Sequence, residues 1–186
     1  MIIHLTDCPS QPWKNGLGST RQIAAYPDGA GIDDFVWRVS LADVDRAAPF
    51  SAFPGIDRQI ALLNGNGFTM TLDEDQVHAL TTPFQPFTFA GEAKVTVALA
   101  DGPTRDFNLM VRRTRASGDV QVWSEPGSYL PDPAIVLVHA ARGHIDTPDG
   151  VLRAGDTWLT TSPVRGDHIT LRDNAVGMAV RIVRKD

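Results

Sequence analysis

Cysteine is almost absent from this 186-residue chain, since Cys8 is the only one. An intrachain disulfide is therefore excluded, and proteins without disulfides are usual in a reducing compartment. The first residues lack the basic start and the long apolar core of a secretory signal peptide. The longest aliphatic run, residues 134–138, is far shorter than a membrane-spanning segment. These absences predict a soluble, cytoplasmic protein with no membrane partner.

Clusters of basic residues are also missing. The chain has 17 Lys and Arg residues against 22 Asp and Glu residues, a formal charge of −5. A net acidic protein repels phosphate backbones, and no local run of Lys and Arg offsets that repulsion. We therefore expect no nucleic-acid partner.

Room for long helices is lacking as well, because 13 prolines and 16 glycines are spread along the chain. The segments between them are short and rich in β-branched and aromatic residues, which is typical of a β-sandwich or β-barrel. We predict an all-β fold, with helix limited to a turn or two near Leu41–Asp45. The predicted strands are 34–41, 58–63, 68–72, 87–89, 95–99, 106–113, 120–123, 135–139, 157–160, 168–171 and 177–184.

A weak internal repeat runs through these strands. The Asn-Gly-Asn-Gly run at 64–67 predicts a β-hairpin between its flanking strands, because Asn-Gly pairs adopt positive φ at little cost. A strand, a glycine turn and a second strand recur at 135–152. Each copy is followed by glycine and an acid, at 91–92 and at 155–156.

This repeated pattern is typical of a cupin barrel. It predicts a bicupin, with an N-terminal cupin-like half at 1–113 and a C-terminal half at 114–186. We expect the halves to form one compact unit with strand exchange.

The metal ligands of a catalytic cupin are missing from both halves. Such cupins hold a divalent cation with a His-x-His-x4-Glu run and a later histidine, because imidazole and carboxylate donate lone pairs to the metal. In the first half that spacing falls on Ser51, Phe53 and Arg58, and in the second half on 129–134, which has no histidine. His168 is close to the later position, but one imidazole does not make a site. We expect neither a metal nor another cofactor.

Arginines on the predicted strands are the residues that remain for chemistry. A guanidinium binds a carboxylate through two parallel hydrogen bonds, which lysine cannot reproduce. Arg58 is the strongest candidate, because the barrel register points it inward. The alternative is that an internal Asp or backbone carbonyls satisfy it. On the strand at 106–112, period-two alternation puts Asn108, Met110 and Arg112 on one face.

Three runs together resemble the HutD/Ves family. They are Trp-Lys-Asn-Gly-Leu-Gly-Ser-Thr at 13–20, Trp-Arg-Val-Ser at 37–40 leading to Phe-Ser-Ala-Phe-Pro-Gly-Ile-Asp-Arg at 50–58, and Asp-Phe-Asn-Leu-Met at 106–110 followed by two arginines. They keep the order of the family and extend over most of the chain. One departure is Leu17, where the family often has glycine.

The resemblance implies a metal-free bicupin that is encoded with histidine-utilisation enzymes and binds a small carboxylate metabolite, such as a formylated or acidic derivative of glutamate. Its implied role is to moderate pathway flux rather than to catalyse a step. We expect Arg58 to anchor the ligand carboxylate. The expected ligand-binding residues are Trp13, Asn15, Trp37, Arg38, Ser40, Ser51, Arg58, Asn108 and Arg112.

Two other functions stay open. An isomerase or hydrolase acting on an amino-acid derivative, such as a formylated glutamate, needs an acid or base near Arg58. The nearest ones in sequence are Asp57, Asp106 and His168. A protein-interaction scaffold would instead be a homodimer formed by pairing of exposed strand edges.

Overall fold

The computed structural model describes residues 1–160 and 168–185, which divide into two compact units. The N-terminal unit contains Pro9–Ser117, and the C-terminal unit contains Met1–Cys8 and the described part of Gly118–Arg184. The division at Ser117 lies close to the expected boundary after residue 113. The first eight residues belong with the C-terminal unit, because Ile2 and Ile3 pair with a strand there.

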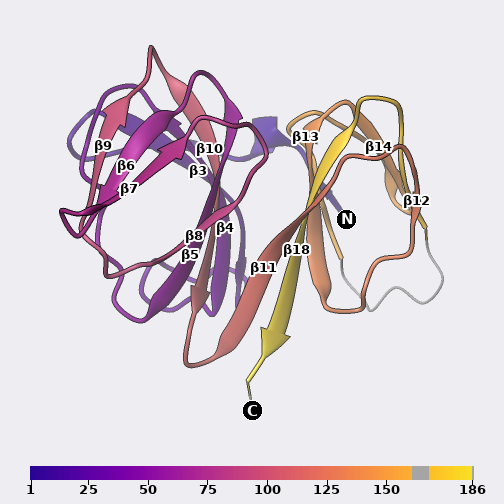
Figure 1. Cartoon of the computed structure of the whole chain (residues 1–186). Helices are drawn as coiled ribbons and strands as arrows, with labels where there is room; N and C mark the ends of the chain where they lie inside the picture. Colours follow the sequence, from indigo (N-terminus) through magenta and orange to yellow (C-terminus); the bar gives the residue numbers. More distant parts are fainter. Residues whose placement is uncertain (161–167, 186) are drawn as a thin grey trace. The chain divides into compact units, whose positions relative to one another are not determined.

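The N-terminal unit consists of antiparallel sheets in two layers (Figure 1). The strand order is β2-β3-β4-β10-β5-β8 in the larger sheet and β7-β6-β9 in the smaller one. The strands are β2 (Ser10–Pro12), β3 (Gly18–Tyr26), β4 (Trp37–Val44), β5 (Ile56–Asn64), β6 (Phe68–Leu72), β7 (Gln76–Leu80), β8 (Phe87–Ala90), β9 (Val95–Leu99) and β10 (Thr104–Arg112).

The C-terminal unit also has its strands in antiparallel sheets, with the orders β1-β16-β13-β18-β11 and β12-β17-β14-β15. A short 3-10 helix, η1 (Leu5–Asp7), is the only helical element in the described residues. The strands are β1 (Ile2–Ile3), β11 (Ala116–Trp123), β12 (Gly127–Tyr129), β13 (Ile135–Arg142), β14 (His144–Thr147), β15 (Gly150–Arg153), β16 (Thr157–Leu159), β17 (Ile169–Leu171) and β18 (Val176–Arg184).

The all-β prediction is confirmed, but the helix expected near Leu41–Asp45 is wrong. That segment continues β4 to Val44, and β4 is paired with β3 on one side and β10 on the other. A central strand has its backbone groups bonded to both neighbours, and this outweighs the local preference of a few helix-forming residues. No helix in the described part of the chain is long and apolar enough to cross a membrane.

The hairpin predicted at Asn64–Gly67 is also wrong. β5 pairs with β10 and β8, whereas β6 pairs with β7 and β9, so this turn carries the chain from one sheet to the other. The glycines are still needed, since Gly65 and Gly67 both have positive φ. The hairpin lies at the next turn, where β6 and β7 are joined through Asp73 and Glu74 with φ of 50° and 75°.

The two units repeat the same strand order. The run β4-β10-β5-β8 corresponds to β11-β18-β13-β16, and β7-β6-β9 corresponds to β15-β14-β17. Gly143 lies between β13 and β14, which belong to different sheets, as β5 and β6 do. The glycine–acid pairs do not correspond, because Gly91 follows β8 whereas Gly155 precedes β16. The repeat is therefore real at the level of strands and only approximate in the sequence.

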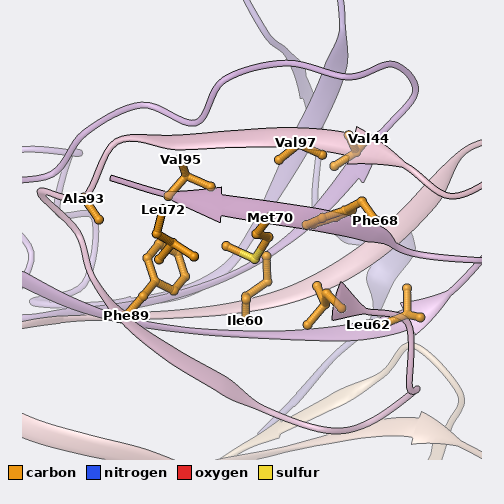
Figure 2. Close-up of a cluster of buried hydrophobic side chains, with 11 residues drawn as sticks. Val44, Ile60, Leu62, Phe68, Met70, Leu72, Phe89, Ala93, Val95 and Val97 are labelled. Atoms are coloured by element: carbon orange, nitrogen blue, oxygen red, sulfur yellow. The ribbon is translucent and has the colours of Figure 1, made fainter. Parts of the chain in front are cut away.

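The core of the N-terminal unit fills part of the space between its two sheets. Figure 2 shows Phe68 and Met70 on β6 facing Ile60 and Leu62 on β5. The buried members of this cluster are Val44, Ile60, Leu62, Phe68, Met70, Leu72, Leu80, Phe89, Ala93, Val95 and Val97. They come from both layers, so this apolar contact is what holds the sheets together.

The turn at Gly67 gives a test of this arrangement. Gly67 and Gly29 have the same φ of 73°, but a Cβ on Gly67 overlaps the backbone carbonyl of Leu80, whereas one on Gly29 meets nothing. Gly29→Ala should cost about 1–2 kcal/mol from backbone strain alone. Gly67→Ala should cost at least about 2 kcal/mol more, because backbone must also move. Urea unfolding followed by tryptophan fluorescence measures both, and equal losses would contradict the crossing turn.

Candidate functional site

A cavity of about 560 Å³ lies within the N-terminal unit. Its wall is formed by inward-facing side chains of β3, β4, β5 and β10, together with the segments 11–15 and 49–53. Val44 and Ile60 belong both to the wall and to the apolar core, so the cavity continues the space that the core fills. Its volume suits a small metabolite.

Two connecting segments are fixed against this wall. In the first, the Trp13 amide donates to the Gly18 carbonyl, and the Trp13 indole Nε1 donates to Thr20 Oγ1 at 2.8 Å. Gly18 lies against the Trp13 ring, where a Cβ would come within 2.9 Å. In the second, the Phe50 amide donates to the Val95 carbonyl of β9, and the Phe53 amide donates to the Gly91 carbonyl next to β8. Backbone bonds therefore hold both segments, and the Trp13 side chain adds a further bond in the first.

The sheet face that lines the cavity carries an ordered set of polar groups. Residues two apart on a strand share a face, so alternate residues of β4, β10 and β5 form rows across the sheet. Arginines lie in one row, a hydroxyl and an amide in the next, and a carboxyl in the third. The rows are Arg38–Met110–Arg58, Ser40–Asn108–Ile60 and Ala42–Asp106–Leu62.

Arg58 is buried under aromatic rings. Its side chain is 7% exposed, and its guanidinium carbon lies 4.8 Å from the centre of the Phe89 ring and about 5.5 Å from those of Phe50 and Phe53. One Nη donates to Asn108 Oδ1 at 3.2 Å, while Nε has no acceptor among the described residues. Burial, and secondly the charge of Arg38, lower the pKa of Arg58 to about 10. Arg58 therefore stays charged at neutral pH.

Arg38 is the second buried guanidinium of the wall, and it is 9% exposed. Its Nε donates to Gln22 Oε1 at 2.8 Å, and Nη1 donates to Ser40 Oγ at 3.3 Å and approaches the sulfur of Met110. Burial lowers the pKa of Arg38. All these partners are neutral, so they orient the cation without neutralising it.

Neither of these arginines has a carboxylate partner within residues 1–160 and 168–185. Two half-buried arginines behave differently: Arg105 is paired with Asp43, and Arg113 with Asp57 and Glu92. Buried charges are usually paired, since an unpaired one loses its hydration without compensation. The cavity therefore has the positive charge and the space to receive an anion.

Asp106 is the one carboxyl group among the described lining residues. It is 0% exposed, its Oδ1 accepts from Thr104 Oγ1 at 3.5 Å, and its Oδ2 has no partner in the described residues. Burial raises the pKa of Asp106 to about 8, which the Thr104 hydrogen bond opposes and the charge of Asp43 adds to. At neutral pH this carboxyl is therefore mostly protonated, and its O–H can donate a hydrogen bond.

Most of the residues expected to bind a ligand come together at this cavity. The expected residues in its lining are Trp13, Asn15, Arg38, Ser40, Ser51, Arg58 and Asn108. Ser51, Phe53 and Arg58, which occupy the spacing of a cupin metal site, all belong to the lining. In the described residues no group of three or more His, Cys, Asp or Glu side chains is placed to hold a metal ion.

Trp37 and Arg112 do not line the cavity. Trp37 stacks on Tyr26, and because it precedes Arg38 on β4 it lies on the opposite face of the sheet. Arg112 donates to the carbonyls of Phe35 and Asp33 and lies over the Phe35 ring. Backbone carbonyls of the segment just before β4 thus bind the guanidinium that alternation alone assigns to the same face as Asn108.

Sequence reasoning missed the aromatic rings around Arg58 and the wall position of Asp106, which it considered only as an acid or base. The alternation of β10 could have revealed the position of Asp106, because Asp106 is two residues before Asn108 and therefore lies on the same face. The other acid–base candidates lie elsewhere. Asp57 is paired with Arg113, and His168 is exposed and belongs to the C-terminal unit.

Comparison with known proteins links the chain to one family and one fold. Residues 5–177 match the family model described as HutD. The chain is 35% identical over 145 residues to an uncharacterized 21.2 kDa protein in the hutC 3'region of Pseudomonas putida, covering 78% of this chain and 75% of that protein. It is 42% identical over 153 residues to protein Ves of Cronobacter sakazakii, covering 82% and 78%.

Solved structures agree with this relationship. A structure of HutD from Pseudomonas fluorescens SBW25, described as a formate condition, superposes with a TM-score of 0.87 at 28% identity, covering 100% of this chain and 99% of that one. A cupin 2 conserved barrel domain protein from Leptotrichia buccalis superposes at 0.60 with 10% identity, covering 100% and 96%, which shows the cupin fold alone.

The buried acid predicts a pH-dependent stability in the absence of ligand. With a pKa of 3.8 unfolded and about 8 folded, Asp106 keeps its proton in the folded protein while the unfolded chain releases it. The free energy of unfolding therefore falls between pH 4 and pH 8, by up to about 1.4 kcal/mol per unit. Asp106→Asn should reduce the loss seen between pH 5 and 7.5 in urea unfolding. Asp75→Asn, on an exposed turn, serves as the control, and an unchanged slope in Asp106→Asn would refute the prediction.

Proposed function

The chain belongs to the HutD family, and we propose that it is a metal-independent binding protein for a small carboxylate metabolite. We further propose that it acts in the cytoplasm as a flux-moderating accessory of histidine utilisation. The support for the pathway is the name of the Pseudomonas putida relative, which places that protein next to hutC.

One observation supports the ligand class above all. Two guanidinium groups, Arg38 and Arg58, are less than a tenth exposed and lie in one cavity, and neither is paired with a carboxylate of the described residues. A carboxylate ligand would supply the missing charge and accept hydrogen bonds from a planar donor fork. Ser51 and Asn108 would bind the polar remainder of the ligand, and the Trp13 ring would cover its apolar part.

Catalysis on an amino-acid derivative, such as a formylated glutamate, is a second candidate that one observation favours. The pKa of Asp106, raised to about 8 by burial, is near the value that suits a general acid or base at neutral pH. Turnover of N-formylglutamate by the purified protein, lost in Asp106→Asn, would support an enzyme. Saturable binding without product formation would support the binding protein.

Ligand-induced thermal stabilisation tests the proposed function. N-formylglutamate and acetate, each titrated to saturation, should raise the melting temperature by several degrees, because a ligand at 100 times its Kd adds about 2.7 kcal/mol. Arg58→Lys should abolish most of this rise, since lysine keeps the charge and lacks the fork. EDTA should leave the rise unchanged.

The matched control is Arg172→Lys, which alters an exposed arginine bound to Asp146 in the C-terminal unit. It should leave the ligand-induced rise intact. Full stabilisation of the Arg58→Lys protein, or loss of stabilisation with EDTA, would argue against the proposed function.

A further inference from the structure

We propose that Asp106 is a second recognition point of the cavity, at which a protonated carboxyl donates a hydrogen bond to an acceptor on the ligand. The site would then select a molecule with a carboxylate at one end and a carbonyl, amide or second carboxyl group at the other. This inference rests on the proposed function and goes beyond it by assigning the far end of the ligand.

The rows of the sheet separate the two recognition points. Asp106 lies four residues from Met110 on β10, and Met110 is in register with both Arg38 and Arg58. At about 3.4 Å per residue, this separates the backbone positions by roughly 14 Å. Asn108, which holds Arg58, lies between them. A ligand that contacts both the guanidinium groups and Asp106 must therefore have polar groups at both of its ends.

The surroundings of Asp106 favour the neutral acid. Its cross-strand neighbours are Ala42 on β4 and Leu62 on β5, neither of which carries a charge. Its Oδ2 is buried without a hydrogen-bond partner in the described residues. An unsatisfied buried polar atom is destabilising, so a ligand that completes this hydrogen bond gains affinity from a group the protein already holds in place.

The charged groups near Asp106 do not pair with it. Lys14 from the segment after β2, Arg38 from β4 and Arg58 from β5 line the same cavity, but the Asp106 carboxyl accepts a hydrogen bond only from Thr104 in the described residues. Asp43, on β4, is bound by Arg105 and acts on Asp106 only through its charge. On the facing sheet, β6 presents the apolar Phe68 and Met70 to the interior of the unit.

Three ligands of one chain length test the proposal. Valerate, glutaramate and 5-aminovalerate share a carboxylate and four further carbons, and differ in ending in a methyl, an amide or an ammonium group. Calorimetric titration at pH 6.5 should show glutaramate binding at least about tenfold more tightly than valerate, because one hydrogen bond to a buried acid increases affinity by about that factor. 5-Aminovalerate should bind more weakly than glutaramate, because a protonated carboxyl does not pair with a cation.

The pH response should differ in sign among the three ligands. With a pKa of about 8, Asp106 is about nine-tenths ionised at pH 9. Glutaramate should then bind about tenfold more weakly than at pH 6.5, 5-aminovalerate should bind more tightly, and valerate should hardly change. Arg58, with a pKa of about 10, remains mostly charged at pH 9 and affects all three ligands alike.

Two variants complete the test. Asp106→Asn keeps an N–H donor without a titrating group, so it should retain the preference for glutaramate and lose the pH response. Asp106→Leu, which resembles its neighbour Leu62, should bind glutaramate and valerate equally. If the unaltered protein binds these two ligands with equal affinity and the Arg58→Lys protein binds neither, the role of Asp106 is refuted and the proposed function still holds. Failure of all three ligands to bind, or binding that survives Arg58→Lys, would overturn the proposed function together with it.

Discussion

The burial of two guanidinium groups on one face of a sheet, without a carboxylate beside them in the described residues, is the constraint on which the site depends. Arg38 and Arg58 lie in the same row on either side of Met110, and neutral amides, a hydroxyl and aromatic rings hold them. These partners fix direction without removing charge. Because the positive charge of this row is not neutralised, the interior of the unit attracts anions. The same unpaired buried charge lowers the stability of the folded protein.

The same sheet also carries the apolar core, and this explains why the polar rows can be held in place. Ile60 and Val44 contribute to both the core and the cavity wall, so the strands that orient Arg58 are clamped by contacts between the two layers (Figure 2). The polar rows are therefore part of a rigid surface rather than of loops. Preorganised donors of this kind lower the conformational entropy that the protein must lose when it binds a ligand.

The fold and the site differ in how much the sequence revealed of them. Short strands punctuated by Gly and Pro predicted the all-β class, and period-two alternation placed Asn108 on the face that lines the cavity. The Asn-Gly turn misled, because a hairpin and a crossing between sheets need the same positive φ and differ only in long-range pairing. The placement of Arg112 in the ligand site was wrong for a similar reason, because its partners, the Phe35 and Asp33 carbonyls, are far away in the sequence. The aromatic rings over Arg58 also come from separate segments.

The pairing of β1 with β16 has a consequence for how the chain can be divided. Met1–Cys8 supplies an edge strand to a sheet whose other strands all come from residue Ala116 onward. A single cut near Ser117 would give a C-terminal fragment with the hydrogen-bonding edge of β16 bare, and an N-terminal fragment with a surplus strand. Bare edges of this kind promote association between chains. The contacts thus divide the protein into two compact units. A single cut of the chain nevertheless does not give two fragments that each contain all the strands of one unit.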